Sequence, residues 1–169
     1  MVNISESLRQ QIATLLGREP RGLEAVAVSD SRGQPMVIRV ASLVEDKPFP
    51  TLFWLIDRSL SYRIDQVEAA GLIKQFQQQV DADPGLQASM REDHSRHIRL
   101  REAYMSDAVR ERLAELGYAD VFVSKGIGGI GDTTRIRCLH TWYAAHLVEP
   151  NTIGRMLDAW WAQAPAVDS

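Results

Sequence analysis

The residues best suited to chemistry lie near the C-terminal end, in the stretch KGIGGIGDTTRIRCLHTWYAAHLVEPNTIG at positions 125–154. This stretch holds the only cysteine, Cys138, and two of the four histidines, His140 and His146. A thiolate with a histidine in reach can act as a nucleophile in acyl or phosphoryl transfer. We therefore take these three residues as candidate catalytic residues. For Cys138 the alternative is a small cysteine that merely packs in the core.

Helical geometry limits how these side chains could act together. On one continuous helix, Cys138 and His140 would point about 200° apart, and Cys138 and His146 would lie about 12 Å apart along the axis. If the segment RIRCLH is instead extended, alternation places Cys138 and His140 on one side, and Thr141 would cap a following helix. The pattern leaves helix and strand open for residues 133–140. In both cases a metal site needs a further ligand from elsewhere.

The other two histidines, His94 and His97, are three positions apart and share one face of a helix. Such a pair could bind a metal or move protons near His140 or His146, or it could belong to a solvated, charged helix face. The strongly polar run EDHSRH favours the solvated face for His97. We expect His94 and His140 to be the metal ligands if a divalent ion such as Zn²⁺ is bound.

Anion binding is the second chemistry that this sequence suggests. Only three of the 19 basic residues are lysines, and arginine offers a planar fork for carboxylate or phosphate. Four glycines at positions 126–131 could turn backbone N–H groups toward an anion, although the loop is neither a Walker loop nor a dinucleotide fingerprint. Solvated arginines and a plain tight turn are the alternatives. The predicted substrate-binding residues are Arg18, Arg21, Gly128, Gly129, Arg135 and Arg137.

Composition excludes several classes of protein. The 169 residues are 45% hydrophobic and 24% charged, which predicts one globular domain over 1–165 with a disordered tail at 166–169. A net charge of -3 and a pI near 5.8 argue against nucleic-acid or acidic-membrane partners. A single cysteine excludes an internal disulfide. We see no signal peptide or membrane span, so the expected location is the cytoplasm, with the oligomeric state left open.

The chemistry-bearing segments must be positioned by an α+β fold. Strand patterns at 23–29, 36–43 and 51–56 predict a small antiparallel sheet of about three strands within residues 23–56. The remaining C-terminal two-thirds is mostly helical in pattern. Helices are expected at 5–16, from 57 with a break at Gly71, from Pro84 to about Tyr104, after Ser106, and at 153–161. Residues 119–124 fit either a short strand or buried coil.

Six blocks of the chain resemble, in order, a bacterial family known as family 501 of the domains of unknown function (DUF501). The blocks are PFPTLFWLID, RIDQVEAAG, DPGLQASMREDH, GIGGI, RCLHTWYAAHL and NTIG. The resemblance runs from GREPRG to NTIG and lends positions rather than a reaction. Actinobacterial members are encoded beside a septum-formation initiator and an exopolyphosphatase, which hints at phosphate metabolism or the cell envelope. The emphasised positions are Arg18, Arg21, Glu68, His94, Cys138, His140, His146 and Asn151.

The chain also departs from the family pattern. Members often carry further histidines near the positions of Trp142 and Ala145, and actinobacterial members have cysteines where this chain has Ser29 and Ser31. A metal site that depended on those residues would be absent here.

Two functions of different classes follow. The first is a small enzyme that acts on an anionic or phosphorylated small molecule through a Cys/His site beside the glycine-rich loop. The second is a non-catalytic regulatory or scaffold protein whose cysteine and histidines are structural. The sequence leaves enzyme and non-enzyme open.

Overall fold

The computed structural model describes residues 3–163, so the predicted tail at 166–169 lies outside the described residues. A three-stranded antiparallel sheet and a mostly helical remainder confirm the predicted α+β class. The elements in chain order are α1 (Glu6–Leu16), β1 (Leu23–Ser29), β2 (Pro35–Val40), β3 (Leu43–Val44), β4 (Lys47–Pro48), β5 (Phe53–Leu55), α2 (Arg58–Ala69), α3 (Leu72–Ala82), α4 (Pro84–Tyr104), α5 (Asp107–Glu115), the 3₁₀ turn η1 (Ile127–Gly129), α6 (Leu139–Val148) and α7 (Thr152–Gln163).

The sheet has the order β1-β2-β5, with both neighbouring pairs antiparallel. Its first hairpin turns through the segment SDSRGQP at positions 29–35. There the Asp30 carboxylate accepts the backbone N–H groups of Arg32 at 2.8 Å and Gln34 at 2.9 Å. Gly33 follows with a φ of 80°, a conformation that glycine adopts without strain. Asp30 and Gly33 thus form this turn through local contacts and local backbone conformation.

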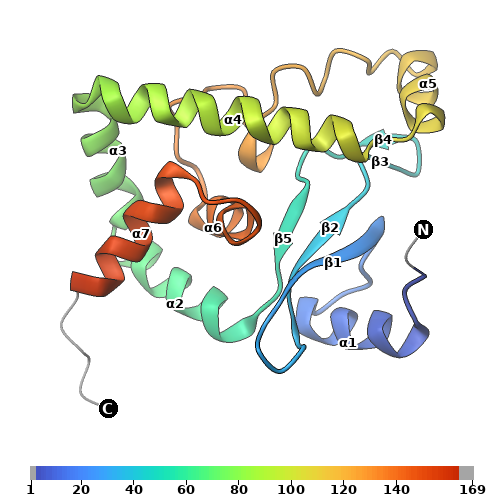
Figure 1. The fold of residues 1–169 in the computed structure, drawn as a ribbon, viewed down its shortest axis with the longest axis horizontal. Coiled ribbons are helices and arrows are strands. Elements are labelled where there is room, and N and C mark those ends of the chain that lie inside the picture. Colours follow the sequence, from blue (N-terminus) through green and yellow to red (C-terminus); the bar gives the residue numbers. More distant parts are fainter. Residues whose placement is uncertain (1–2, 164–169) are drawn as a thin grey trace.

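Helices cover both faces of the sheet. Successive strand residues point to opposite sides, so neighbours in one strand pack into different cores. Val37 packs into the larger core, which includes residues of α2, α3, α6 and α7. Its neighbour Ile38 packs into a smaller core with Ile12 of α1. Figure 1 shows α6 and α7 on one side of the strands and α1 on the other. Sites on these two faces are therefore separated by the sheet.

The predicted helix boundaries hold where capping chemistry is strong. Gly71, with a φ of 91°, separates α2 from α3 as predicted. Asp83 caps α4 by accepting the N–H groups of Gly85 at 2.8 Å and Leu86 at 3.2 Å, and Pro84 occupies the first helical turn. From there α4 crosses the molecule (Figure 1).

The segment after β2 differs from prediction. The strand expected to reach position 43 ends at Val40, and a second small hairpin, β3–β4, lies between it and β5. Its turn residues Glu45 and Asp46 have positive φ values of 50° and 59°. Arg112 of α5 holds Asp46 through two hydrogen bonds of 2.9 and 2.7 Å. This long-range contact fixes the turn without the usual asparagine or glycine.

Helix α4 turns polar side chains inward. Asp93, His94, His97 and Arg101 expose only 4%, 3%, 6% and 1% of their surfaces. The prediction that His97 lies on a solvated face is therefore wrong. Hydrogen bonds to the backbone of other segments offset the burial of the charged members of this run. Asp93 accepts the Thr152 N–H at 2.8 Å, and Arg101 donates to the carbonyl oxygens of Phe122 and Lys125.

Residues 119–124 form turns rather than a strand, with Phe122 buried. This matches the coil alternative. Among residues 3–163, no helix combines the length and the apolar character required to span a membrane.

Candidate functional site

The site forms where an extended segment enters α6. Cys138 is the N-cap of this helix, with φ -151° and ψ 118°. The residues before it, from 135 to 137, are neither helix nor strand, which settles the question left open by the pattern. The helix starts at Leu139, so the predicted cap at Thr141 is wrong. Instead, the Thr141 hydroxyl donates to the Cys138 carbonyl at 3.0 Å and tightens the first turn.

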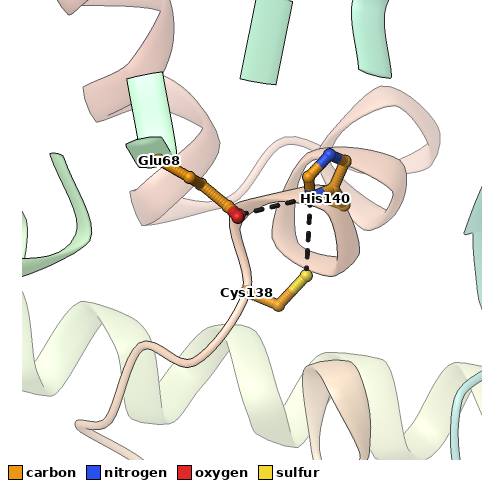
Figure 2. Close-up of side chains that lie close together, drawn as sticks. All are labelled: Glu68, Cys138 and His140. Atoms are coloured by element: carbon orange, nitrogen blue, oxygen red, sulfur yellow. Dashed lines mark hydrogen bonds and ion pairs between the residues drawn. The ribbon is translucent and has the colours of Figure 1, made fainter. Parts of the chain in front are cut away.

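Three side chains converge at this helix start. The His140 Nδ1 lies 3.7 Å from Cys138 Sγ and 3.2 Å from Glu68 Oε1 (Figure 2). One donor atom from each residue lies within 4.8 Å of the others, and all three residues are partly exposed. Glu68 Oε1 also accepts the Leu139 backbone N–H at 2.8 Å. The carboxylate thereby satisfies an N–H of the helix start and stays next to the imidazole.

The opposite edge of the His140 ring faces α2. Its Nε2 lies 2.8 Å from Asp65 Oδ1 and 3.3 Å from the Ser61 carbonyl oxygen. Both of these atoms are hydrogen-bond acceptors, so Nε2 carries a proton. With Nε2 protonated, Nδ1 carries a lone pair when the ring is neutral and an N–H when the ring is an imidazolium.

The charges of these groups set their protonation. Burial raises the pKa of the Cys138 thiol, but the hydrogen bond to His140, the Thr141 backbone contact and the charge on His140 together bring that pKa below its ordinary value. The hydrogen bond to Cys138 raises the pKa of His140 to about 9, against the effect of burial, and the Glu68 and Asp65 carboxylates add to it. With no metal bound, this contact favours the ionised thiolate of Cys138 together with the imidazolium of His140.

Residue-level reasoning from the sequence missed Asp65 and Ser61, and Glu68 entered only through the family resemblance. A signal was present, because positions 61, 65 and 68 have the i, i+4, i+7 spacing of one helix face. The pattern did not show which segment this helix face contacts. The residues that this stripe meets lie about 70 positions later in the chain, as the Glu68–Leu139 contact with its separation of 71 shows.

His146 is not brought together with Cys138 and His140. Six positions after His140 on the same helix, it faces another direction. Its Nδ1 accepts the Asn151 N–H at 3.0 Å, and its Nε2 donates to Asp158 of α7 at 2.7 Å. Tyr143 donates to the same carboxylate at 2.7 Å. In this place His146 ties α6 to α7.

His94 is also held away from the cluster. Its Nδ1 accepts the Ile127 N–H at 3.0 Å, so the lone pair that a metal would need is already engaged. The ring packs edge-on against Trp142 with centroids 5.0 Å apart, and burial lowers the pKa of His94, which keeps the ring neutral. The predicted pairing of His94 with His140 in one site therefore lacks support from the geometry.

The glycine-rich loop is shaped by close packing. Within it, the Ile127 N–H binds His94, and the Gly129 N–H binds the Gly126 carbonyl at 3.0 Å. Gly128 and Gly129 have φ values of 73° and 71° and lie against Thr141 and Pro50. These contacts explain the glycines without a ligand, and their predicted contact with a substrate stays a prediction.

Comparison with known protein families assigns the chain to a family. Residues 26–159 of the 169 match the family model described as "Protein of unknown function (DUF501)". The chain belongs to this family. The match confirms the resemblance, and it includes Glu68, Cys138 and His140. No curated protein and no solved structure matches the chain significantly.

The four arginines predicted to bind substrate in this DUF501 protein lie in two separate places. Arg135 and Arg137 are exposed on the extended segment that leads to Cys138. Arg18 and Arg21 lie in the turn after α1, on the other face of the sheet, where they line a separate pocket. The family match begins after this turn. The structure thus joins Cys138 and His140 with Glu68, and does not join them with Arg18 or Arg21.

Proposed function

We propose that this protein is a small metal-dependent enzyme in which Glu68, Cys138 and His140 hold a zinc-type divalent ion. The convergence of the three donor atoms within 4.8 Å carries the proposal. In a tetrahedral zinc site, bonds of about 2.0–2.3 Å separate the donor atoms by roughly 3.3–3.7 Å. The distances from His140 Nδ1, 3.2 Å to the carboxylate and 3.7 Å to the sulfur, lie close to that range.

The surroundings favour a cation. When Cys138 is ionised, its thiolate and the Glu68 and Asp65 carboxylates place three negative charges around one imidazole. A divalent ion would take the place of the imidazolium proton at Nδ1 and offset these charges. Asp65 would then accept the Nε2–H, which is how carboxylates commonly orient metal-bound histidines. A bare anion at the sulfur would instead meet the Glu68 carboxylate.

Three protein ligands leave a fourth coordination position, which in catalytic zinc sites binds a water molecule and makes it acidic. The three ligands are partly exposed, so this position is within reach of solvent. Arg135 and Arg137, exposed on the neighbouring segment, can bind a carboxylate or phosphate. The reaction class that fits is hydrolysis of a small anionic ester, in which water adds across the bond to give an acid and an alcohol. A cytoplasmic location is part of this proposal.

Metal content tests the site directly. Protein produced with zinc in the medium should retain about one equivalent by elemental analysis, as a three-ligand site with a bound water requires. Glu68→Gln, Cys138→Ser and His140→Ala should each lose most of it. The control Glu111→Gln changes an exposed carboxylate on α5 and should retain the metal. Equal zinc in wild type and in all three cluster variants would refute the site.

Activity is a separate measurement. Hydrolysis of p-nitrophenyl phosphate should require the metal, and Arg135→Ala with Arg137→Ala should raise KM for this anionic ester more than for neutral p-nitrophenyl acetate. Metal binding with no hydrolysis of either ester would support the regulatory or scaffold alternative.

The distance of 3.7 Å between Cys138 Sγ and His140 Nδ1 favours a second candidate, a cysteine nucleophile that works without metal. If this candidate is right, Cys138 of chelator-treated protein should be alkylated rapidly at pH 7. His140→Ala should slow the alkylation, because loss of the hydrogen bond raises the pKa of Cys138. The difference between the two proteins should disappear at high pH, where both thiols are ionised.

A further inference from the structure

A second pocket lies on the α1 face of the sheet, away from the cluster. It encloses about 480 Å³, within the size range of small-molecule sites. Its walls come from the end of α1, the turn after it, strand β2 and the β3–β4 hairpin. The pocket is thus formed entirely by the first third of the chain.

The floor of this pocket is apolar and rigid. Ile38 and Val40 of β2 expose 1% and 3% of their surfaces and form part of the smaller core. Beside them Phe49 and Trp54 stack with ring centroids 5.7 Å apart and planes at 12°. Such a surface would exclude water from a bound apolar group.

The rim carries the charge. Arg18 places its guanidinium over the Trp54 ring, 4.7 Å from the centroid, and Lys47 of β4 also lines the pocket. The two acidic residues of the rim are already engaged, Glu45 with Arg21 at 3.6 Å and Glu19 with Arg9 at 3.5 Å. Within residues 3–163 neither Arg18 nor Lys47 forms a salt bridge. The pocket therefore presents two uncompensated cations above an apolar floor.

We propose that this pocket binds a small organic anion, a carboxylate or a phosphate carried on an apolar body about as large as two fused rings. The anionic group would lie between Arg18 and Lys47, where charge-assisted hydrogen bonds are available. The apolar body would cover Ile38, Val40 and the exposed edge of the Phe49–Trp54 pair. The proposal does not depend on the metal cluster.

Three naphthalenes that differ only in their substituent test this. In isothermal titration calorimetry of chelator-treated protein, in which the proposed hydrolysis is switched off, 1-naphthyl phosphate or 1-naphthoate should bind with one site, and neutral 1-naphthol should bind at least about tenfold more weakly. The stronger of the two anions identifies the head group. Arg18→Gln and Lys47→Gln should each weaken the anion about tenfold and leave 1-naphthol unchanged. Both positions are exposed, so neither variant should disturb folding.

Matched controls are Arg32→Gln and Lys74→Gln, exposed residues outside the pocket, which should bind as wild type does. The proposal is overturned if no naphthalene binds, if 1-naphthol binds as tightly as the anions, or if Arg18→Gln and Lys47→Gln change nothing.

Two further variants separate this pocket from the metal cluster. His140→Ala should bind the naphthyl anion normally, and Arg18→Gln should retain zinc. Loss of naphthyl binding in His140→Ala would place the ligand at the cluster and overturn the second site while leaving the proposed function intact. If wild type binds the naphthyl anion but holds no zinc, the proposed function fails and the second site stands.

Discussion

Glu68 is the residue on which the cluster depends. Its Oε1 accepts the Leu139 N–H at 2.8 Å and lies 3.2 Å from the His140 ring. The first bond fixes the carboxylate at the positive end of α6, so the oxygen is held beside the imidazole whether or not a metal is bound. A ligand held in this way loses little conformational freedom on binding an ion.

Asp65 provides a graded test of the same site. It contacts His140 at 2.8 Å from the side away from Cys138 and is not one of the three converging residues. If His140 binds metal through Nδ1, Asp65→Asn should lower zinc affinity about 10- to 100-fold, because loss of the carboxylate weakens orientation and basicity of the ring. Competition with a chromophoric chelator measures this. An unchanged affinity would mean that Asp65 is only a surface ion partner.

At the scale of elements, two buried histidines each lie against a glycine of a following segment. A Cβ at Gly126 would lie 2.1 Å from His94 Nδ1, and a Cβ at Gly154 would lie 2.0 Å from His146 Cγ. These contacts dock η1 onto α4 and α7 onto α6. The glycines of the GIGG and NTIG segments are therefore required by packing.

Gly126→Ala tests this docking at a glycine whose φ is negative, -85°. We expect a loss of about 2–3 kcal/mol in the free energy of unfolding, since His94 is buried and has no room to move. Gly131→Ala is the control in the same loop: its Cβ would meet nothing closer than 3.9 Å. That variant should change stability by less than about 0.5 kcal/mol. Urea denaturation measures both, and equal losses would contradict the packing account.

At the scale of the whole molecule, α4 joins the helical layer to the loop that follows α5. The fully buried Arg101 donates to the carbonyl oxygens of Phe122 at 3.2 Å, Pro50 at 3.0 Å and Lys125 at 2.6 Å. Burial lowers the pKa of this guanidinium to about 10, which leaves it charged at neutral pH. One side chain thereby ties α4 to two other backbone segments, the loop after α5 and the stretch before β5.

His97 makes the stability of the whole protein sensitive to acid. Burial, with the charge of Arg101 and the neighbouring His94, lowers the pKa of His97 from 6.5 to about 3. Between these values the unfolded chain binds a proton and the folded protein does not, so stability falls as the pH drops below about 6.5. From pH 6.5 to pH 5 the loss is about 2 kcal/mol from this residue.

Urea denaturation at pH 7 and pH 5 measures this loss, with His97→Leu as the comparison. The leucine cannot be protonated, so its difference between the two pH values should be smaller than that of wild type by about 2 kcal/mol. Parallel losses in the two proteins would show that His97 does not set the acid sensitivity.

The sequence by itself determined the elements whose cause is local. Strand β1, the break at Gly71 and the Asp83–Pro84 start of α4 follow from periodicity and capping, which act over a few residues. The family and the place of the Cys138–His140 pair could also be inferred. Each of these rests on neighbours in the chain.

Only the tertiary structure decided which residues meet. It joined His140 to Asp65 and Glu68, sent His146 to Asp158, and enclosed His94 against Gly126. The physical reason is that a polar side chain has the same local pattern whether it faces solvent or a buried backbone group. The partner that decides between the two comes from a distant segment, as Arg112 does for the β3–β4 turn.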